Sequence, residues 1–434
     1  MKHILVILIG IVICINSCRL PADPLGDITI ITRLDTINTG GDCLDLDVDM
    51  VDENMNPGDS ILVAAANSNG YLFYKINSID GIISGLTEQN HHSNQEMDTE
   101  NGSDEAHSVI LSTSHNIAFV MDKGLHHIWV YKYGEDDSYT APYLDEDCYG
   151  GSWRSFTIDD RSDSIGVYTL LNHDSAGGIF IEESTSLAWQ GVDPESTSLD
   201  AACEHIINQD DIAEKIYFDD GLLSMAYGEQ GVRVFKQTKD EICLIAGEIQ
   251  DLSYDDLCSE NYDNSGEIDY KSCCENLAIC PDELLEQCGA DCCSFFEFGK
   301  GGKFSSSRGI VPQIYAEFDT PGEVEAIYSK GNAIFAGLSN SNGCIITTLG
   351  SDGSITGSTL FAIGSTIRGI HEDNGLLALA ASHDGILLYN WNGSDVVPIG
   401  KIETSKAYNV KVAGKIIFAA TEDGIEVIQI DYTP

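Results

Sequence analysis

The chain has 434 residues, of which 70 are Asp or Glu and 22 are Lys or Arg, so its formal net charge is -48 at pH 7. A charge of that sign and size disfavours non-specific binding to nucleic acid or to an anionic membrane surface. Hydrophobic residues make up 43% of the chain and charged residues only 21%, which excludes a disordered polyanion and is typical of a folded protein with a large core.

The amino terminus has the pattern of an export signal. Lys2 and His3 precede an apolar run over 4–15, which is too short to span a bilayer. The residues up to Cys18 resemble the lipobox of bacterial lipoproteins, in which a peptidase cleaves ahead of a lipid-modified cysteine. The resemblance predicts a signal peptide over 1–17 and lipidation of Cys18. An ordinary secretory signal is the alternative.

The residues after the predicted cleavage site indicate a location. Arg19 stands where an Asp would resemble an inner-membrane retention signal, so a lipid-anchored linker over 18–26 in the outer membrane of a bacterial envelope is predicted. The lipid is the only predicted membrane contact. Disulfides persist in that compartment, and without Cys14 and Cys18 the chain keeps an even number of its 14 cysteines.

Residues 27–434 carry a repeated hairpin pattern. Each copy has an apolar strand rich in small residues, then a turn, then an alternating strand that begins with Gly and ends with an aromatic residue. The paired segments are 61–66 with 70–74, 117–120 with 128–131, 165–168 with 178–181, 222–227 with 231–235, 333–336 with 343–346, 376–381 with 385–389, and 416–420 with 424–428. Such antiparallel units predict an all-β fold, a seven-bladed β-propeller.

The last repeat is one strand short. It offers three strands, over 408–412, 415–420 and 425–430, and no fourth strand follows before Pro434. An alternating segment over 28–34 would supply the fourth strand, because an unpaired strand edge is a liability that closed rings avoid. The sequence therefore predicts a ring closed by its N-terminal strand.

Two segments resemble the LVIVD-repeat family of bacterial surface propellers. They are Gly-Val-Arg-Val-Phe at 231–235 and Leu-Ala-Leu-Ala-Ala at 377–381. The resemblance covers about 43–77, 107–249 and 322–431. It implies a surface-exposed interaction scaffold and assigns no catalytic residue.

Extra sequence separates the first repeats. It lies at 87–106, 145–153, 191–212 and 250–321, each interpreted as a connection from the fourth strand of one blade to the first strand of the next. Such connections emerge on one face of a propeller, so the sequence predicts an acidic binding face there. Solvated loops without a ligand are the alternative. The segment 250–321 is predicted to be a cysteine-rich insertion between blades 4 and 5.

That insertion contains a calcium-loop pattern. Residues 261–272 resemble an EF-hand loop, with Gly266 at the sharp turn. The resemblance implies oxygen ligands from Asn261, Asp263, Ser265, Asp269 and the backbone carbonyl of Glu267. Ser272 replaces the bidentate Glu of the family, so the implied calcium affinity is weak. An acidic turn without an ion is the alternative.

The same region is rich in cysteine. The candidates for disulfides are Cys243, Cys258, Cys273, Cys274, Cys280, Cys288, Cys292 and Cys293. An exported chain without a nearby His favours disulfides over a zinc site, and a segment too small for a core of its own needs such cross-links. The sequence does not choose among the many pairings.

Charged residues gather at the predicted starts of the first strands, which line the channel of a propeller. They are His107, Arg154, Lys215, Glu325 and Arg368. The cations among them would hold an anion or a carboxylate at the channel mouth. The alternative is structural pairing with Glu325 and with Asp45 and Asp47, because buried charges are normally paired.

These patterns predict a function at the level of class. The expected protein is an exported, lipid-anchored propeller that binds a protein or glycan at the cell surface through loops on one face. No nucleophile or phosphate-binding motif occurs in the sequence. A propeller metalloenzyme, a hydrolase, lyase or lactonase-like protein with ligands scattered one per blade, is the alternative.

Overall fold

The computed structural model describes residues 30–50, 60–68, 70–79, 82–93, 106–112, 114–122, 127–132, 152–160, 165–173, 184–192, 204–209, 213–237 and 310–431. These residues form strands and turns and contain no α-helix; one 3-10 turn, η2, spans Gly228–Gln230. No helix in the described part of the chain is long and apolar enough to cross a membrane.

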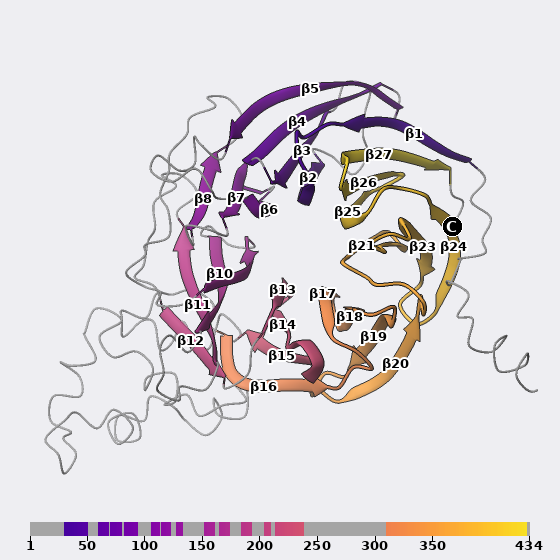
Figure 1. Cartoon of the computed structure of the whole chain (residues 1–434). Helices are drawn as coiled ribbons and strands as arrows, with labels where there is room; N and C mark the ends of the chain where they lie inside the picture. Colours follow the sequence, from indigo (N-terminus) through magenta and orange to yellow (C-terminus); the bar gives the residue numbers. More distant parts are fainter. Residues whose placement is uncertain are drawn as a thin grey trace, which may run out of the picture.

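The strands form small antiparallel sheets arranged in a ring (Figure 1). One four-stranded sheet contains β2 (Cys43–Met50), β3 (Ser60–Asn67), β4 (Gly70–Ile79) and β5 (Ile82–Ser93). A three-stranded sheet contains β6 (Ala106–Ser112), β7 (Ile117–Asp122) and β8 (His127–Lys132). Next comes the sheet of β9 (Ser152–Asp159), β10 (Ile165–His173), β11 (Ser184–Val192) and β12 (Glu204–Gln209).

The second half of the ring repeats this order. One sheet contains β13 (Lys215–Asp219), β14 (Leu222–Ala226), β15 (Val232–Gln237) and β16 (Ile310–Phe318). Another contains β17 (Val324–Lys330), β18 (Ala333–Leu338), β19 (Gly343–Leu349) and β20 (Ile355–Phe361). The next contains β21 (Gly369–Asp373), β22 (Leu376–Ala380), β23 (Ile386–Trp391) and β24 (Val396–Ile402). The prediction of an all-β propeller is confirmed.

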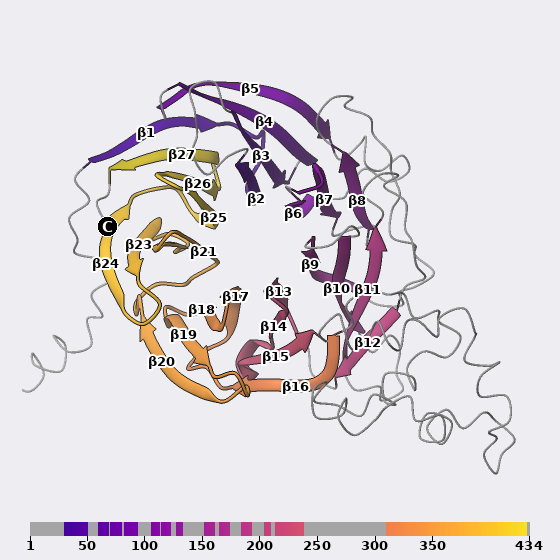
Figure 2. The same ribbon diagram turned by 180° about the vertical axis from the view of Figure 1, so that it is seen from behind.

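The final sheet joins the two ends of the described chain. It contains β25 (Ala407–Ala413), β26 (Ile416–Thr421), β27 (Gly424–Asp431) and, on its outer edge, β1 (Ile30–Ile37). Ile30 lies opposite Asp431 and Ile37 opposite Ile425, with a register shift between Arg33 and Asp35. Seen from behind, β1 again follows β27 along its whole length (Figure 2).

The apolar, often small residues that recur in the sequence repeats form the second strands of the sheets. Every residue of β18, β22 and β26 is buried, because both faces of each sheet pack against neighbouring sheets. A strand buried on both faces has no polar alternation. The alanines in these strands let neighbouring sheets approach closely while larger partners, such as Phe335 and Phe418, fill the remaining space.

The glycine at or directly before the start of most third strands has a steric reason. A Cβ on Gly424, whose φ is +118°, would lie 2.1 Å from the carbonyl oxygen of Ile37. Gly385 stands in the same relation to Ile402, with a distance of 2.3 Å. Only glycine lets the end of the outer strand come this close, so the repeated Gly of the sequence pattern marks contact between third and fourth strands.

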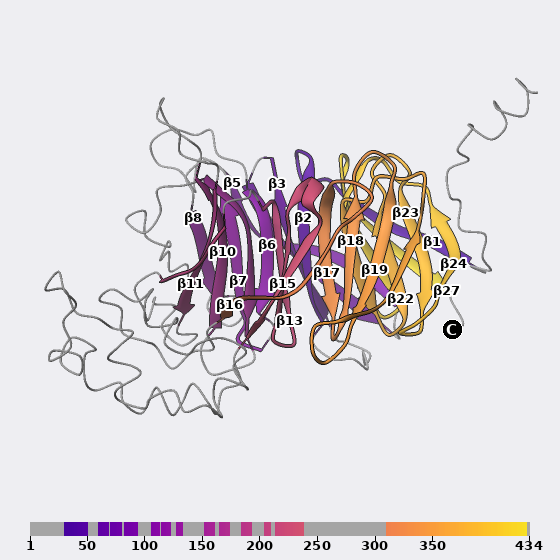
Figure 3. The same cartoon turned by 90° about the horizontal axis from the view of Figure 1, so that it is seen from below.

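The ring has two faces, which we name by the first strand of each sheet. The start face is where first strands begin; turns between second and third strands and connections from one sheet to the next lie there. The end face is where first strands end; turns between first and second strands and connections from third to fourth strands lie there. Figure 3 shows the strands running from one face to the other.

The predicted place of the cysteine-rich insertion is wrong. β16 is the fourth strand of its sheet and pairs with β15, with Val232 opposite Phe318. The segment between β15 and β16 therefore interrupts one sheet and does not separate two. The apolar residues around Cys243 resemble a fourth strand in sequence, but the alternation from Ile310 to Phe318 provides the one that pairs with β15.

The predicted strands over 165–212 also need correction. The third strand is β11, not the segment 178–181, which lies outside the described residues. The fourth strand is β12, inside the stretch 191–212 that was interpreted as a loop. Likewise β5 extends to Ser93, so the connection interpreted as 87–106 begins after that residue.

These corrections overturn the prediction of one common insertion face. The connection between β5 and β6 joins two sheets, so its ends lie on the start face. The connections from β11 to β12 and from β15 to β16 join third to fourth strands, so their ends lie on the end face.

Candidate functional site: the polar inner ring

The first strands β2, β6, β9, β13, β17, β21 and β25 lie nearest the centre of the ring (Figure 1). Side chains on one first strand accept hydrogen bonds from backbone N–H groups of the next. Asp47 accepts from Leu111 at 2.8 Å, Thr157 from Phe218 at 3.2 Å, and His371 from Val412 at 3.1 Å. Two residues earlier, Asp45 accepts from Val109 and Ser155 from Ile216. Two residues later, Asp219 accepts from Gly331 and Asp373 from Gly414.

These links satisfy N–H groups that no strand partner could reach. Adjacent first strands are not paired to each other in any of the sheets, so their inward backbone groups would otherwise be left to water. In each link the N–H donor lies one residue after the residue of the next strand that is equivalent to the acceptor. Because the same spacing repeats around the ring, it aligns the first strands and identifies one equivalent middle residue on each. We call the residues at that position the inner ring: Asp47, Ile110, Thr157, Tyr217, Tyr328, His371 and Lys411.

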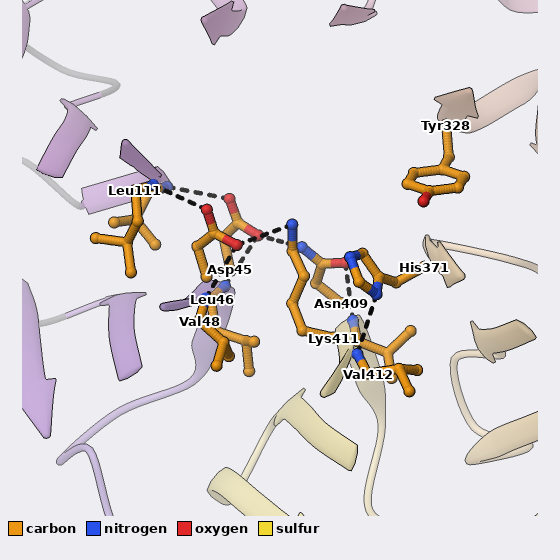
Figure 4. A network of polar contacts seen from close by, with 12 residues as sticks. Asp45, Leu46, Val48, Leu111, Tyr328, His371, Asn409, Lys411 and Val412 are labelled. Carbon is orange, nitrogen blue, oxygen red and sulfur yellow. Dashed lines mark hydrogen bonds and ion pairs between the residues drawn. The ribbon is translucent and has the colours of Figure 1, made fainter. Parts of the chain in front are cut away.

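The charged part of the inner ring lies where β25 meets β2. Lys411 Nζ is 3.0 Å from Asp47 Oδ1, and the two side chains are 20% and 14% exposed, so solvent still reaches them. Asn409 donates to Asp45, as Figure 4 shows. Burial lowers the pKa of Lys411, but Asp47 and Asp45 outweigh it, so the pKa is raised and the ammonium stays charged.

The acceptor capacity of both carboxylates is used by the protein. Asp45 accepts from the backbone of Leu46 and Val109, from Ser108 Oγ and from Asn409. Asp47 accepts from the backbone of Val48 and Leu111 and pairs with Lys411. Both side chains are thereby fixed in position by several donors of the protein.

The other arc of the inner ring is aromatic. The Tyr217 and Tyr328 rings lie 4.9 Å apart between centroids, and those of Tyr328 and His371 lie 5.6 Å apart. The Tyr328 hydroxyl donates to the Glu372 carbonyl at 3.1 Å. Burial, and then the nearby Asp219 and Asp47 charges, raise the pKa of Tyr217, so its phenol is neutral.

His371 is neutral for a related reason. Burial lowers its pKa well below the usual 6.5, and the positive charges of Lys411 and Lys330 lower it further. Its Nδ1 accepts the Val412 N–H, so the proton of the neutral imidazole is on Nε2. In Figure 4 His371 lies between Tyr328 and the Lys411 group.

The anion site at the channel mouth stays a prediction. Of its residues, His107, Arg154, Lys215 and Glu325 lie near the starts of their first strands, Arg368 lies directly before β21, and Arg368 pairs with Glu325 at 3.6 Å. Asp45 and Asp47 pair with Lys411 and Asn409 instead of with the mouth cations. His107 and Arg154 stand one residue before the position of Lys215 along their strands, so alternation directs them to different sides.

The other predicted site residues lie outside the described residues. These are Cys18, the calcium-loop residues Asn261, Asp263, Ser265, Glu267 and Asp269, and the cysteines Cys243, Cys258, Cys273, Cys274, Cys280, Cys288, Cys292 and Cys293. The two described cysteines, Cys43 and Cys344, are free and buried. Among the residues that the structure describes, no group of three or more His, Cys, Asp or Glu is placed to hold a metal ion.

Sequence reasoning missed the inner ring apart from Asp47. The alternation of side chains along a strand does distinguish the inner-ring positions. Asp45 and Asp47 are two residues apart, so they share one side of β2. Tyr217, Tyr328, His371 and Lys411 each lie a fixed distance before the second strand of their own hairpin. Aligning the first strands by that distance would have brought the four together.

No family model matches the chain, and no curated protein matches it. Among solved structures it is similar to a computationally designed protein named Ika8, with 10% identity and a TM-score of 0.44 over 92% of this chain and 99% of that one. It is also similar to a chain of a mitotic checkpoint complex, with 10% identity and a TM-score of 0.45 over 96% of each chain. Likenesses this distant carry no argument here, and the fold rests on the strand pairing.

Proposed function

We propose that the protein is an exported, lipid-anchored propeller that binds a macromolecular partner at the bacterial cell surface. Two features support a scaffold: side chains link the first strands into a rigid ring, and long insertions leave that ring at strand ends. The insertions, not the repeated strands, are free to vary without cost to the core.

One observation carries the choice of binding surface. The connections from β11 to β12 and from β15 to β16 start and finish on the end face, and they belong to neighbouring sheets. The fourth strands β12 and β16 contact each other. The segments 193–203 and 238–309 are therefore anchored side by side, and we propose that together they bind a protein or glycan partner, which weak calcium binding at Asp263 and Asp269 would support.

The matching experiment shortens each segment to a Gly-Ser connection between the same strand ends. The ring should still fold, since loop closure costs little, while the shortened proteins should lose the partner that the full chain captures from envelope extracts. Shortening 94–105, which is anchored on the start face, is the matched control and should leave capture intact. Loss of capture only in that control would move the binding surface to the start face.

The anchor is tested separately. Cys18→Ser should move the protein from the membrane fraction to the soluble fraction, because a diacylated and N-acylated cysteine supplies enough apolar area for stable attachment. Cys14→Ser, inside the proposed signal peptide, is the control and should remain anchored. Unchanged anchoring of Cys18→Ser would contradict the lipoprotein proposal.

We further propose that the three-stranded sheet β6–β8 is a full member of a seven-bladed ring that β1 closes. The support is continuity: Asp45 and Asp47 accept from β6, and Ser112 donates to Asp160 beyond β9 at 3.1 Å. The hydrophobic contacts of β7 and β8 also extend to both neighbouring sheets.

A further inference from the structure

Two hydrogen-bonding groups of the inner ring have no hydrogen-bond partner among the residues that the structure describes. They are the Tyr217 hydroxyl and His371 Nε2. Both side chains are partly buried, with Tyr328 between them and the Val412 backbone against His371. Every neighbouring polar group of the ring, in contrast, has a partner: Asp45, Asp47, Lys411 and Tyr328 are engaged as described above.

The two unpartnered groups have the same hydrogen-bonding character. His371 Nε2 carries the proton, because Nδ1 accepts from Val412. The Tyr217 phenol is neutral and also donates. The nearby acceptors are occupied, so the centre of the ring offers donors to a ligand and has no free carboxylate for a cation. A ligand that fits must bring acceptor oxygens.

Charge restricts the ligand further. Two carboxylates, Asp45 and Asp47, face one ammonium, Lys411, so this part of the ring is net negative, in a chain whose total charge is -48. An anion would be repelled, and a neutral ligand would not. The Tyr217 ring itself packs against Tyr328, so the hydroxyl is the group of Tyr217 that is left for a ligand.

We propose that the centre of the propeller binds a neutral sugar residue, with hydroxyl or ring oxygens accepting from Tyr217 and His371. This site is separate from the end-face surface proposed above, and neither depends on the other. Placed polar groups of this kind are what fixes the orientation of a small molecule in a binding site.

The test uses the full chain and a panel of free neutral monosaccharides: glucose, galactose, mannose and N-acetylglucosamine. At least one should bind in a titration followed by saturation-transfer NMR. Tyr217→Phe removes only the hydroxyl and should weaken that binding about tenfold, the value of one hydrogen bond. His371→Asn keeps an acceptor for Val412 but loses the Nε2 donor, and should weaken binding to a similar degree.

Tyr315→Phe is the matched control, because the Tyr315 hydroxyl donates to Gly350 on the outside of the ring. It should bind the sugar as the unchanged protein does. Thermal melting checks that each variant is folded, and the two independent variants keep the test decisive if one is not. Absence of binding to every sugar, unchanged binding in both ring variants, or Tyr217-dependent binding of acetate or methylammonium instead would each overturn the proposal.

Discussion

Lys411 supplies the positive charge that offsets Asp47 where the first and last sheets meet. Both side chains are mostly buried, so removing one partner leaves an uncompensated charge. Lys411→Met should lower the free energy of unfolding by about 3 kcal/mol, measured by urea denaturation. Adding Asp47→Asn, which keeps an acceptor for Leu111, should cost less than the sum of the single changes.

The control for that measurement is Lys401→Met. Lys401 lies 3.2 Å from Glu403, whose side chain is 81% exposed, so the pair is screened by water. Its loss should cost less than about 1 kcal/mol. Equal effects of the two lysine substitutions would contradict the assignment of Lys411 as a buried counter-charge.

His371 makes stability depend on pH in a defined direction. Its pKa in the folded protein is lowered by burial and then by Lys411 and Lys330, so the unfolded chain binds the proton more readily. Stability is therefore present above the unfolded pKa and falls as pH drops below about 6.5, by up to about 1.4 kcal/mol per pH unit. His371→Asn should remove that slope between pH 6.5 and 5, as measured by denaturation at each pH.

Glu426 also makes the stability depend on pH, in the opposite direction to His371. Burial raises its pKa, although Arg33 partly opposes the shift, so the folded protein holds this proton more readily and the effect on stability has the opposite sign. Both proteins in the comparison contain Glu426, so only their difference reports His371. An identical pH slope in the two would show that the imidazole titrates normally.

Single residues were the hardest feature to predict. Asp47 is distinguished in the sequence by its charge, whereas Tyr217 and Tyr328 are aromatic residues of apolar strands, as is typical of core positions. Their role depends on the packing of successive sheets, which brings β13 beside β17 and β17 beside β21, and on a Tyr328 hydroxyl bond to a backbone carbonyl. Neither of these long-range contacts can be inferred from the local sequence around Tyr217 or Tyr328.

At the scale of elements, β1 is the outer strand of the last sheet. Deleting residues 27–37 would leave the outer edge of β27 unpaired and remove the Arg33 pair with the buried Glu426. An open strand edge recruits other chains, so the shortened protein should aggregate, as measured by light scattering. A synthetic peptide spanning 27–37, added in trans, should restore solubility by taking the vacant edge.

The control deletion removes 20–26 and keeps β1 complete. That protein should stay as soluble as the full chain. If both deletions behave alike, the pairing of β1 would not be what protects the last sheet.

Elements were predicted well where repeats are regular and poorly where they are interrupted. The hairpins β22–β23 and β26–β27 lie close to their predicted bounds, because each has a buried strand, a short turn and a glycine with a steric role. In the sheet β13–β16 the fourth strand follows a long insertion, and several apolar stretches compete for the place. Periodicity does not decide between them, because pairing with β15 is a long-range choice.

At the scale of the whole molecule, the two described cysteines differ from those predicted to form disulfides. Cys43 and Cys344 are free, and burial raises the pKa of both thiols, with Asp45 adding to the effect at Cys43. Neither should react with a thiol reagent in the native protein, because thiolate is the reactive form. In denaturant without reductant, these two thiols alone should react if the remaining cysteines of the exported protein form disulfides.

A larger thiol count in denaturant would contradict the disulfide-linked insertion, and a count of two before denaturation would contradict burial of Cys43 and Cys344. Cys344→Ser identifies one of the two signals. It should remove one thiol from the denatured count, and it replaces a buried sulfur by a hydroxyl of similar size.

The pairing of β1 with β27 also sets an order on folding. Ile30 pairs with Asp431 across nearly the whole described chain, so β1 has no partner until β27 has been made. Contacts this distant in sequence form slowly and leave strand edges open meanwhile. Pairing of β1 is therefore late in folding, and a chain truncated before β27 leaves β1 without its partner strand.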